Sequence, residues 1–483
     1  MTATPRARWL ALYVLCLGDL MIVLDGTIVN VALPTIRDDL GFSQTSLAWV
    51  VNAYLLTFGG FLLLGGRLGD LFGQRRMFLI GIALFTFASL ACGLATTQGQ
   101  LVVARAVQGL GGALVAAVAL SLTMMLFTEP ADRAKAMGIF GFVLSGGGAI
   151  GVLAGGILTD VLDWHWIFLV NLPIGILVFA LSLKLLPFTP GIAGGGRIDF
   201  AGAITVTGSL MLAVYAIVNG NETGWTSGET LGLLAGALVL MAAFLVIESR
   251  ISAPLVPLSI FRHRNVSSAN AVGVLMAAGM FAYFFFSALY MQEILGYSPL
   301  EVGLAYLPAT ILWGGTSLYS DKLVMRYGIK KPLTAGLGLM ALGLILFARA
   351  PVDGNVIVDV LPATLAIGLG GGIAFNPLLL SAMGDVKPEE SGLASGVVNT
   401  AFMMGGALGL AVLASLADFR TDNLLDSGES ALSALNSGYH AAFLLGAVFV
   451  VAAIAVGVAL LRPTMAHPHG EPVGEPALEG AEH

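Results

Sequence analysis

The sequence predicts an all-α integral membrane protein, and three observations lead to this fold class. Of the 483 residues, 57% are hydrophobic and only 11% are charged, whereas an ordinary soluble domain is about 25% charged. The apolar residues come in blocks of about 20, the length that a helix needs to cross the ~30 Å hydrocarbon core of a bilayer. The polar stretches between these blocks are too short to form soluble domains. Most of the protein surface is therefore expected to face lipid.

Fourteen apolar windows, bounded by charged residues, glycine or proline, are expected to be transmembrane helices. They lie at 9–33, 46–66, 77–95, 101–126, 136–158, 165–186, 198–218, 230–248, 266–292, 300–320, 332–349, 356–380, 392–416 and 439–461. The first window follows a short basic start and has no small-residue cleavage site, so we expect it to be retained rather than removed as a signal peptide. Cys16 and Cys92 fall inside windows, where we expect core residues rather than a disulfide or a metal site.

The distribution of basic residues orients these helices. Of the 22 Lys and Arg residues, 18 lie at the N-terminus, in the even-numbered loops or just after the last window. The opposite side has only Arg37, Arg349 and Arg420, and Arg105 lies within a window. Because basic residues collect on the cytoplasmic side, both termini are expected to be cytoplasmic. After Arg462, a run rich in Gly, Pro and Glu cannot bury enough apolar surface to fold, so we expect a disordered tail whose histidines bind no metal.

A charged turn joins the second and third windows. Its motif consists of Gly66, Leu68, Asp70, Gly73, Arg75 and Arg76. The glycines permit close backbone approach, and an acid among arginines can tie neighbouring helices together. The positive-inside rule alone explains the arginines, but not the spacing of the glycines and the acid. We therefore expect Gly66, Asp70, Gly73, Arg75 and Arg76 to form a conformational latch.

A degenerate copy of this motif follows the tenth window. Leu323, Gly328, Lys330 and Lys331 stand at the places of Leu68, Gly73, Arg75 and Arg76, whereas Met325 replaces the acid. Such a repeat predicts two related halves, which in transporters hold the substrate between them near the bilayer midplane. We expect an N-terminal six-helix bundle at 1–187, two inserted transmembrane helices with their flanking loops at 188–264, a C-terminal six-helix bundle at 265–462 and the tail at 463–483.

Longer motifs occur in order along the chain. They are Leu24-Asp25-Gly-Thr27-Ile-Val-Asn30-Val-Ala-Leu-Pro34, Arg105-Ala-Val-Gln108-Gly109-Leu-Gly111, Trp164-His-Trp166-Ile-Phe-Leu-Val-Asn171-Leu-Pro173-Ile-Gly175, Tyr290-Met-Gln292-Glu293-Ile-Leu-Gly296-Tyr297-Ser-Pro299 and Ser391-Gly392-Leu-Ala-Ser395-Gly396. Together with the turn motif, they resemble the fourteen-helix drug:proton antiporter (EmrB/QacA-type) family of the major facilitator superfamily over nearly the whole chain. Two positions depart from that family: Val152 stands where a proline is usual, and Phe402-Met403 where an Arg-Gln pair is common.

The resemblance implies both a fold and a function. The expected fold is the major facilitator fold, with two six-helix bundles plus two inserted helices. The expected function is proton-coupled efflux of small lipophilic compounds (drugs, antibiotics and dyes) by alternating access across the plasma membrane of a bacterium, which confers resistance. We further expect a monomer surrounded by membrane lipid, driven by the proton gradient without a cofactor.

One acid lies deep in the first window. Asp25 has some seven residues still to run before the outer surface, so its carboxylate must face a wet cavity, find a partner or take up a proton. The alternative is a hydrogen bond that only fixes helix packing. The resemblance implies that Asp25 is the proton-coupling acid and that Arg105 takes part in coupling. Arg105 lies at a comparable depth, although it could instead snorkel to the interface.

Eight further side chains are candidates for the substrate cavity or its rim. They are Asp19, Asn30, Gln108, Gln292, Glu293, Asn376, Phe402 and Met403. Asp19 lies about 240° around the helix from Asp25, so a structural role is favoured there, and Glu293 is alternatively an acid of the outer surface. Phe and Met favour adaptable contact with bulky apolar ligands. Separately, Gly147, Gly151, Gly155 and Gly156 clear one helix face for close packing.

Other functions remain as alternatives. An exporter dedicated to one endogenous metabolite or antibiotic product, or a proton-coupled uptake transporter, would have the same fold. A membrane enzyme or sensor is disfavoured, because the loops contain no nucleotide-binding motif, no His-rich metal cluster and no Ser-His-Asp set. Neither a nucleic acid nor a metal is an expected partner.

Overall fold

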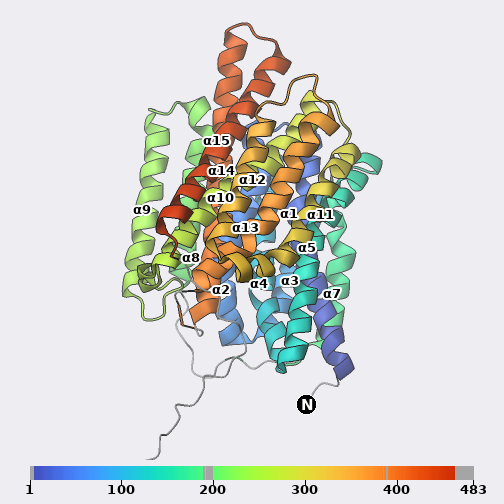
Figure 1. The fold of residues 1–483 in the computed structure, drawn as a ribbon, viewed down its shortest axis with the longest axis vertical. Helices are drawn as coiled ribbons and strands as arrows, with labels where there is room; N and C mark the ends of the chain where they lie inside the picture. Colours follow the sequence, from blue (N-terminus) through green and yellow to red (C-terminus); the bar gives the residue numbers. More distant parts are fainter. Residues whose placement is uncertain (1–4, 189–190, 192–198, 385, 388–389, 463–483) are drawn as a thin grey trace, which may run out of the picture.

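The computed structural model describes residues 5–188, 191, 199–384, 386–387 and 390–462, in which every regular element is a helix. Long helices run side by side as tilted columns (Figure 1). The α-helices are α1 (Pro5–Leu40), α2 (Trp49–Phe72), α3 (Gln74–Gly93), α4 (Gln98–Leu126), α5 (Pro130–Val161), α6 (Trp166–Leu169), α7 (Asn171–Leu185), α8 (Phe200–Thr223), α9 (Gly228–Arg250), α10 (Arg264–Leu289), α11 (Pro299–Tyr327), α12 (Lys330–Phe347), α13 (Leu361–Met383), α14 (Ser391–Asp426) and α15 (Ala431–Leu460). Short 3-10 or π segments are η1 (Ser46–Ala48), η2 (Leu258–Arg262), η3 (Tyr290–Ile294) and η4 (Val356–Val360). The tail expected at 463–483 lies outside the described residues.

Twelve helical segments of the described chain are long and apolar enough to cross a membrane, which confirms the all-α membrane class. The two expected spans outside this set are α5 and α11, which have 32 and 29 residues and thus exceed the ~20 that a crossing needs. Within α5, the stretch Gly146–Val161 is itself apolar, whereas Gly, Ser, Thr and Tyr residues lower the hydropathy of α11. The count of fourteen stays a prediction.

Several helices are longer than the apolar windows. α14 continues to Asp426 and α15 begins at Ala431, so their joined ends project beyond the other columns (Figure 1). Hydropathy marks only the apolar part of a helix, whereas backbone hydrogen bonding carries it on through polar residues.

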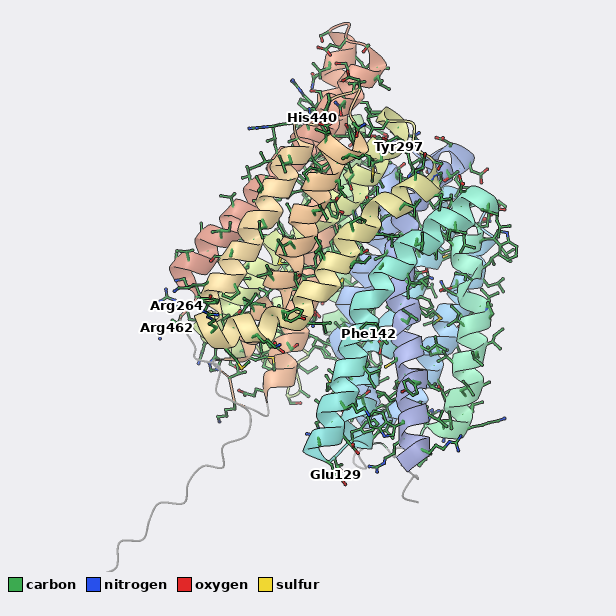
Figure 2. All side chains as sticks on the ribbon, turned by 45° about the vertical axis from the view of Figure 1, so that its right-hand side comes forward. Glu129, Phe142, Arg264, Tyr297, His440 and Arg462 are labelled. Atoms are coloured by element: carbon green, nitrogen blue, oxygen red, sulfur yellow. The ribbon has the colours of Figure 1, made fainter. Side chains whose placement is uncertain are left out.

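The helix packing of the N-terminal half recurs in the C-terminal half. α1 packs on α5 and α3 on α4; correspondingly, α10 packs on α14 and α12 on α13. The two halves meet where α5 contacts α11 and where α2 contacts α14. We call the end that carries Arg37 the outer end and the end that carries Arg75 the inner end, following the expected orientation. In Figure 2 the two groups of helices stand apart at the inner ends labelled Glu129 and Arg264, and Phe142 of α5 is 65% exposed there.

The turn motif and its degenerate copy make equivalent contacts. Gly73 and Gly328 both adopt positive φ, at 96° and 74°, a conformation that side chains rarely tolerate. Arg75 Nη2 then donates to Leu183 O near the end of α7, at 2.5 Å, and Lys330 Nζ donates to Val458 O near the end of α15. The repeat in the sequence is therefore a repeat in the structure.

The inserted helices flank the two halves. α8 packs on α2 and α14, whereas α9 packs mainly on α8 and stands at the edge of the molecule (Figure 1). Leu238 and Val239 of α9 are 72% and 66% exposed, as expected for side chains that face lipid.

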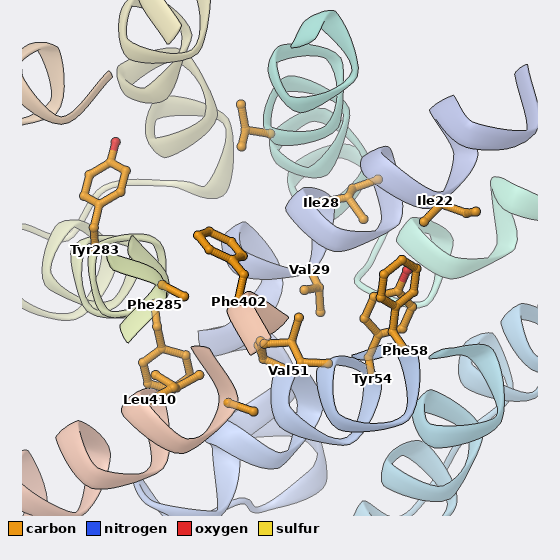
Figure 3. Close-up of a cluster of buried hydrophobic side chains, with 14 of the residues drawn as sticks. Ile22, Ile28, Val29, Val51, Tyr54, Phe58, Tyr283, Phe285, Phe402 and Leu410 are labelled. Atoms are coloured by element: carbon orange, nitrogen blue, oxygen red, sulfur yellow. The ribbon is translucent and has the colours of Figure 1, made fainter. Parts of the chain in front are cut away.

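Buried apolar side chains fill the space within and between the halves. Figure 3 shows Val29 of α1 and Val51 and Tyr54 of α2 on one side of this core, with Phe402 of α14 on the other. The four glycines of α5 that were expected to pack closely do allow neighbouring helices to approach. An added Cβ would lie 2.0 Å from Thr27 Oγ1 at Gly151 and 2.6 Å from Ile28 O at Gly155. It would lie 3.0 Å from Leu20 Cδ1 at Gly147 and 2.7 Å from Pro299 O at Gly156. With Val152 in place of proline, α5 runs unbroken.

Candidate functional site

A buried ion pair links α1 to α4. Arg105 Nη1 lies 2.5 Å from Asp25 Oδ2, and the two side chains are 1% and 0% exposed. Arg105 therefore does not snorkel to the interface. Two opposite charges in a low-dielectric interior attract strongly, but the pair is tolerated only where further hydrogen bonds replace the lost water.

Amide side chains complete the environment of the Asp25 carboxylate. Gln108 Nε2 and Asn171 Nδ2 donate to Asp25 Oδ1 at 2.7 and 3.0 Å. Arg105 also donates to Gln108 Oε1 and, through Nε, to Val50 O. All three side chains that contact the carboxylate are donors, so this arrangement suits its ionised form, because a carboxylic acid would need an acceptor for its proton.

Aromatic rings flank the arginine in the same site. The Arg105 guanidinium lies 4.4 Å from the centroid of the Tyr54 ring and 5.6 Å from that of Phe168, which adds cation–π attraction to the ion pair. Sequence reasoning missed Asn171 and these rings as partners. Asn171 lies in the motif from Trp164 to Gly175, and its place in that motif was the sequence feature that could have marked it as a functional residue.

Asp19 has a different environment on the same helix. It is 4% exposed, and its Oδ2 accepts no hydrogen bond within the described residues. It does not share the face of Asp25, as its position on the helix predicted.

A cavity of about 170 Å³ lies between the two halves. Its lining residues are Thr27, Gly148, Met280, Tyr283, Phe284, Ala309, Thr310, Trp313 and Gly368, from α1, α5, α10, α11 and α13. None of these side chains is charged. Aromatic faces, a thioether and a few hydroxyls suit a compact, mainly apolar molecule.

None of the eight side chains expected at the cavity or its rim lines this cavity, but Gln292 and Glu293 line a second pocket of about 520 Å³ at the outer end. Gln108 belongs to the Asp25 network, and Asn30 donates to the backbone of its own helix at Gly26 O. Asn376 bonds to Ser317 on α11. These amides pair with nearby acceptors because an unpaired polar group is costly in a buried position.

The aromatic and sulfur-containing candidates pack between helices. Phe402 is 2% exposed and contacts the rings of Phe281 and Phe375, while Met403 faces Gly59 of α2. Phe402 thus contacts rings of its own half and Met403 contacts the other half, and neither lines the described cavity. Trp313 and Thr310, which do line it, lie in an apolar window without any distinguishing motif.

Gln292 and Glu293 belong to a contact between the halves at the outer end, which we call the outer seal. Arg37 Nη1 lies 2.5 Å from Glu293 Oε1, and Tyr439 OH donates to Glu293 Oε2 at 2.6 Å. Gln44 Nε2 donates to Tyr439 OH at 2.8 Å, and Gln292 Nε2 donates to Val31 O at 2.9 Å. Glu293 is thus an acid of the outer end, but its side chain is only 9% exposed.

The charged turn ties helices within the N-terminal half. Asp70 Oδ1 accepts from Gln74 Nε2 at 2.9 Å, Gly73 forms the turn, and Arg75 holds the end of α7. Gly66 has open space beside it, and Arg76 is exposed. The described contacts of this motif bind α2, α3 and α7 to one another.

Comparison with known proteins shows that the chain matches one protein family and is similar to several transporters. The model of the Major Facilitator Superfamily matches residues 15–410. The chain is 40% identical to the puromycin resistance protein pur8 of Streptomyces alboniger over 466 residues, which cover 96% of this chain and 91% of that protein. It is 38% identical to the cephamycin export protein CmcT of Amycolatopsis lactamdurans over 467 residues, with 96% and 94% covered. It is 33% identical to the multidrug transporter protein MdtP of Bacillus subtilis over 403 residues, with 83% and 74% covered.

Solved structures show the same fold at low sequence identity. A POT family peptide transporter aligns with a TM-score of 0.69 and 14% identity, covering 97% of this chain and 99% of that chain. The nucleoside transporter NupG aligns with a TM-score of 0.67 and 13% identity, covering 94% and 100%. These likenesses concern the arrangement of helices alone.

Proposed function

The chain belongs to the Major Facilitator Superfamily, and on that premise we propose that it exports small lipophilic drugs or antibiotics across the bacterial plasma membrane in exchange for protons. It is a multi-pass membrane transporter and not an enzyme. Relatives named for puromycin resistance, cephamycin export and multidrug transport support the export direction. Export of a toxic compound confers resistance.

The observation that carries the coupling is the buried Asp25–Arg105 pair. A pair with such low exposure costs several kcal/mol of desolvation per ion, and intramembrane ionisable groups are a mark of proton pathways. Proton uptake by Asp25 would remove the charge that holds Arg105, Gln108 and Asn171. The same acid can therefore link a proton to a change in helix packing.

The described conformation corresponds to one stage of an alternating-access cycle. The outer seal is closed, the halves stand apart at the inner end, and Asp25 is surrounded by donors. In the proposed cycle this is the stage after proton loss, with the cavity ready to take substrate from the cytoplasm. Opening of the outer seal and separation of the ion pair then let substrate leave and a proton bind from outside. Both termini face the cytoplasm in this scheme, and a monomer without a cofactor suffices.

The gradient supplies enough energy for this exchange. One proton moving down a potential of 100 mV releases about 2.3 kcal/mol, and each pH unit adds about 1.4 kcal/mol. One or two protons therefore sustain a concentration ratio of roughly a hundredfold or more.

A direct test compares cells with and without the protein. We expect lower accumulation of puromycin and of the dye ethidium in cells that contain it, and an uncoupler that collapses the proton gradient should abolish the difference. Higher accumulation would indicate uptake instead. An unchanged accumulation of both compounds would contradict the proposal.

A second candidate is a dedicated exporter of one antibiotic product. The chain is 36% identical over 420 residues to a probable actinorhodin transporter of Streptomyces coelicolor, and CmcT is named for one antibiotic class. Resistance to a single compound within a panel of dyes and antibiotics would favour this candidate over multidrug export.

A further inference from the structure

The two buried acids of α1, Asp25 and Asp19, differ in their hydrogen-bond partners. Asp25 is 0% exposed and accepts hydrogen bonds from three side chains, whereas Asp19 is 4% exposed and its Oδ2 accepts none within the described residues. An isolated carboxylate in such a place lacks both water and a counter-ion, which is among the most costly situations for a side chain. This environment disfavours the charged form of Asp19 and favours the neutral carboxylic acid.

Within the described part of the chain, no ion pair involves Asp19. Its titratable neighbour is the thiol of Cys16, one turn away. The helices packed on α1 carry their charged residues near their ends or in the Asp25 ion pair. In the N-terminal half these are Asp132, Arg133, Lys135 and Asp160 towards the two ends of α5, Lys184 near the last turn of α7, and Arg105 of α4 in the ion pair. In the C-terminal half they are Arg264 at the start of α10, Glu293 just after α10, and Glu301, Asp321, Lys322 and Arg326 in the outer and inner turns of α11. His165 stands just before the short helix α6 at the outer end. A carboxylate at position 19 would thus have no partner of opposite charge.

The position of Asp19 also gives its proton a route. Residues seven apart on a helix point in nearly the same direction, so Asp19 shares a stripe of α1 with Gly26. An added Cβ at Gly26 would meet nothing within 4 Å, so this stripe borders open space. Asp19 precedes Asp25 on α1, which runs from the inner end to the outer end with Arg37, so Asp19 lies nearer the inner end. Both acids are buried in this conformation, at 4% exposure for Asp19 and 0% for Asp25, so the open space at Gly26 is the nearest place from which water can approach Asp19 along this stripe.

We propose that Asp19 carries a second exchangeable proton, separate from that of Asp25, so that each transport cycle exchanges two protons. This inference rests on the proposed function. In the described state the O–H bond of the Asp19 carboxylic acid breaks when water reaches the stripe; the proton passes to that water and the electron pair stays on the carboxylate. Rebinding of a proton from the outer side restores the neutral acid.

The alternative is an acid that stays protonated and only packs. Asp19→Asn distinguishes the two, because the amide has the size and neutrality of the carboxylic acid but does not ionise. Asp19→Glu keeps the acid. The control is Asp160→Asn, which removes an exposed acid at the outer end of α5.

The first measurement needs no substrate. Infrared difference spectra of the purified protein between acidic and alkaline pH should contain a carboxylic acid band that shifts in D2O. We expect Asp19→Asn to lose the part of this band that belongs to Asp19 and to keep the part from Asp25 and the other carboxyl groups, whereas Asp160→Asn should keep the part that belongs to Asp19. Persistence of the whole band in Asp19→Asn would overturn the inference while leaving the proposed function intact.

The second measurement gives the number of protons per substrate. Wild type and variants are placed in liposomes, and the pH difference that halts net transport is found at set voltages, with whichever of puromycin and ethidium the wild type exports. We expect two protons per substrate for wild type, Asp160→Asn and Asp19→Glu, and one for Asp19→Asn. An equal ratio in wild type and Asp19→Asn overturns the inference, whereas a wild type without proton-driven transport overturns the proposed function itself.

Discussion

In the N-terminal half, α1 and α4 bury the acidic and basic side chains of Asp19, Asp25 and Arg105, whereas the described residues of the C-terminal half bury no acidic or basic side chain to this extent. In the C-terminal half, α10, the counterpart of α1, instead makes aromatic contacts: its Tyr283 packs against Tyr306 of α11 and Phe347 of α12. The packing of helices is nevertheless the same in both halves. The two halves thus share one arrangement of helices but differ in the side chains that they bury.

This difference indicates a division of labour. A charge inside a membrane protein is costly, so the ions of the N-terminal half point to proton movement there. The cavity between the halves takes seven of its nine lining residues from α10, α11 and α13. The C-terminal half therefore supplies most of the surface that a substrate would touch. Changes in one half should affect coupling, and changes in the other should affect affinity.

The largest expected effect follows from removing the charge of Asp25. Asp25→Asn should abolish proton-driven export and also destabilise the fold by about 3–5 kcal/mol, because Arg105 is left buried without a counter-ion. The double variant Asp25→Asn with Arg105→Gln removes both charges and should regain thermal stability. Export assays and thermal unfolding in detergent measure the two quantities separately.

The double variant is the decisive one of the pair. If it regains stability but not export, the ions serve transport and not merely folding. Restored export in the double variant would show that neither charge is needed, and would reduce the contrast between the halves to a difference in packing.

The origin of this contrast was only partly visible in the sequence. The repeat of Gly73 and Arg75 at Gly328 and Lys330 predicted the two halves, and helix length placed Asp25 and Arg105 at one depth. Hydropathy and spacing act along one helix, so they locate a buried charge and its level in the membrane.

The partners of buried groups depend instead on how helices rotate against each other. Gln108 was therefore assigned to the cavity although it bonds to Asp25, and Trp313 was not singled out, since an apolar side chain in an apolar window carries no mark of its function. Glu293 was placed at the outer end, but its partner Arg37 lies 256 residues away. Such a contact exists only once the halves are assembled.

The next largest effect tests the role of the C-terminal half. Trp313→Ala removes a large aromatic face from the cavity, so we expect the KM for the exported compound to rise about tenfold, equivalent to about 1.4 kcal/mol. The ratio of protons to substrate should not change. Trp225→Ala, at an exposed tryptophan between α8 and α9, is the matched control. A changed proton ratio in Trp313→Ala would contradict the division of labour.

A smaller effect is expected where the halves are joined. Glu293→Gln weakens the ion pair with Arg37 in the outer seal, and a partly exposed pair contributes about 1 kcal/mol, enough to shift a two-state equilibrium about fivefold towards outward opening. Thr27→Cys places a thiol in the cavity, while the native Cys16 and Cys92 are buried. Labelling of that thiol by a membrane-impermeant reagent added outside should rise severalfold in the Glu293→Gln background.

The control for this experiment is Glu229→Gln, at an exposed acid in the first turn of α9. It should leave the labelling rate unchanged. If Glu293→Gln also leaves the rate unchanged, the contact joins the halves in this conformation but does not limit opening.

The smallest effect concerns the charged turn and its copy, a feature that the two halves share. Arg75 and Lys330 each donate to a carbonyl near the end of the last helix of their half, so Arg75→Ala and Lys330→Ala should each cost about 0.5–1 kcal/mol of stability. Thermal unfolding in detergent should show a similar, small decrease for both, with export retained. Loss of export in Arg75→Ala alone would mean that the charged turn has a role in transport that its copy lacks. The asymmetry between the halves would then extend from their interiors to the turns that hold their helices together.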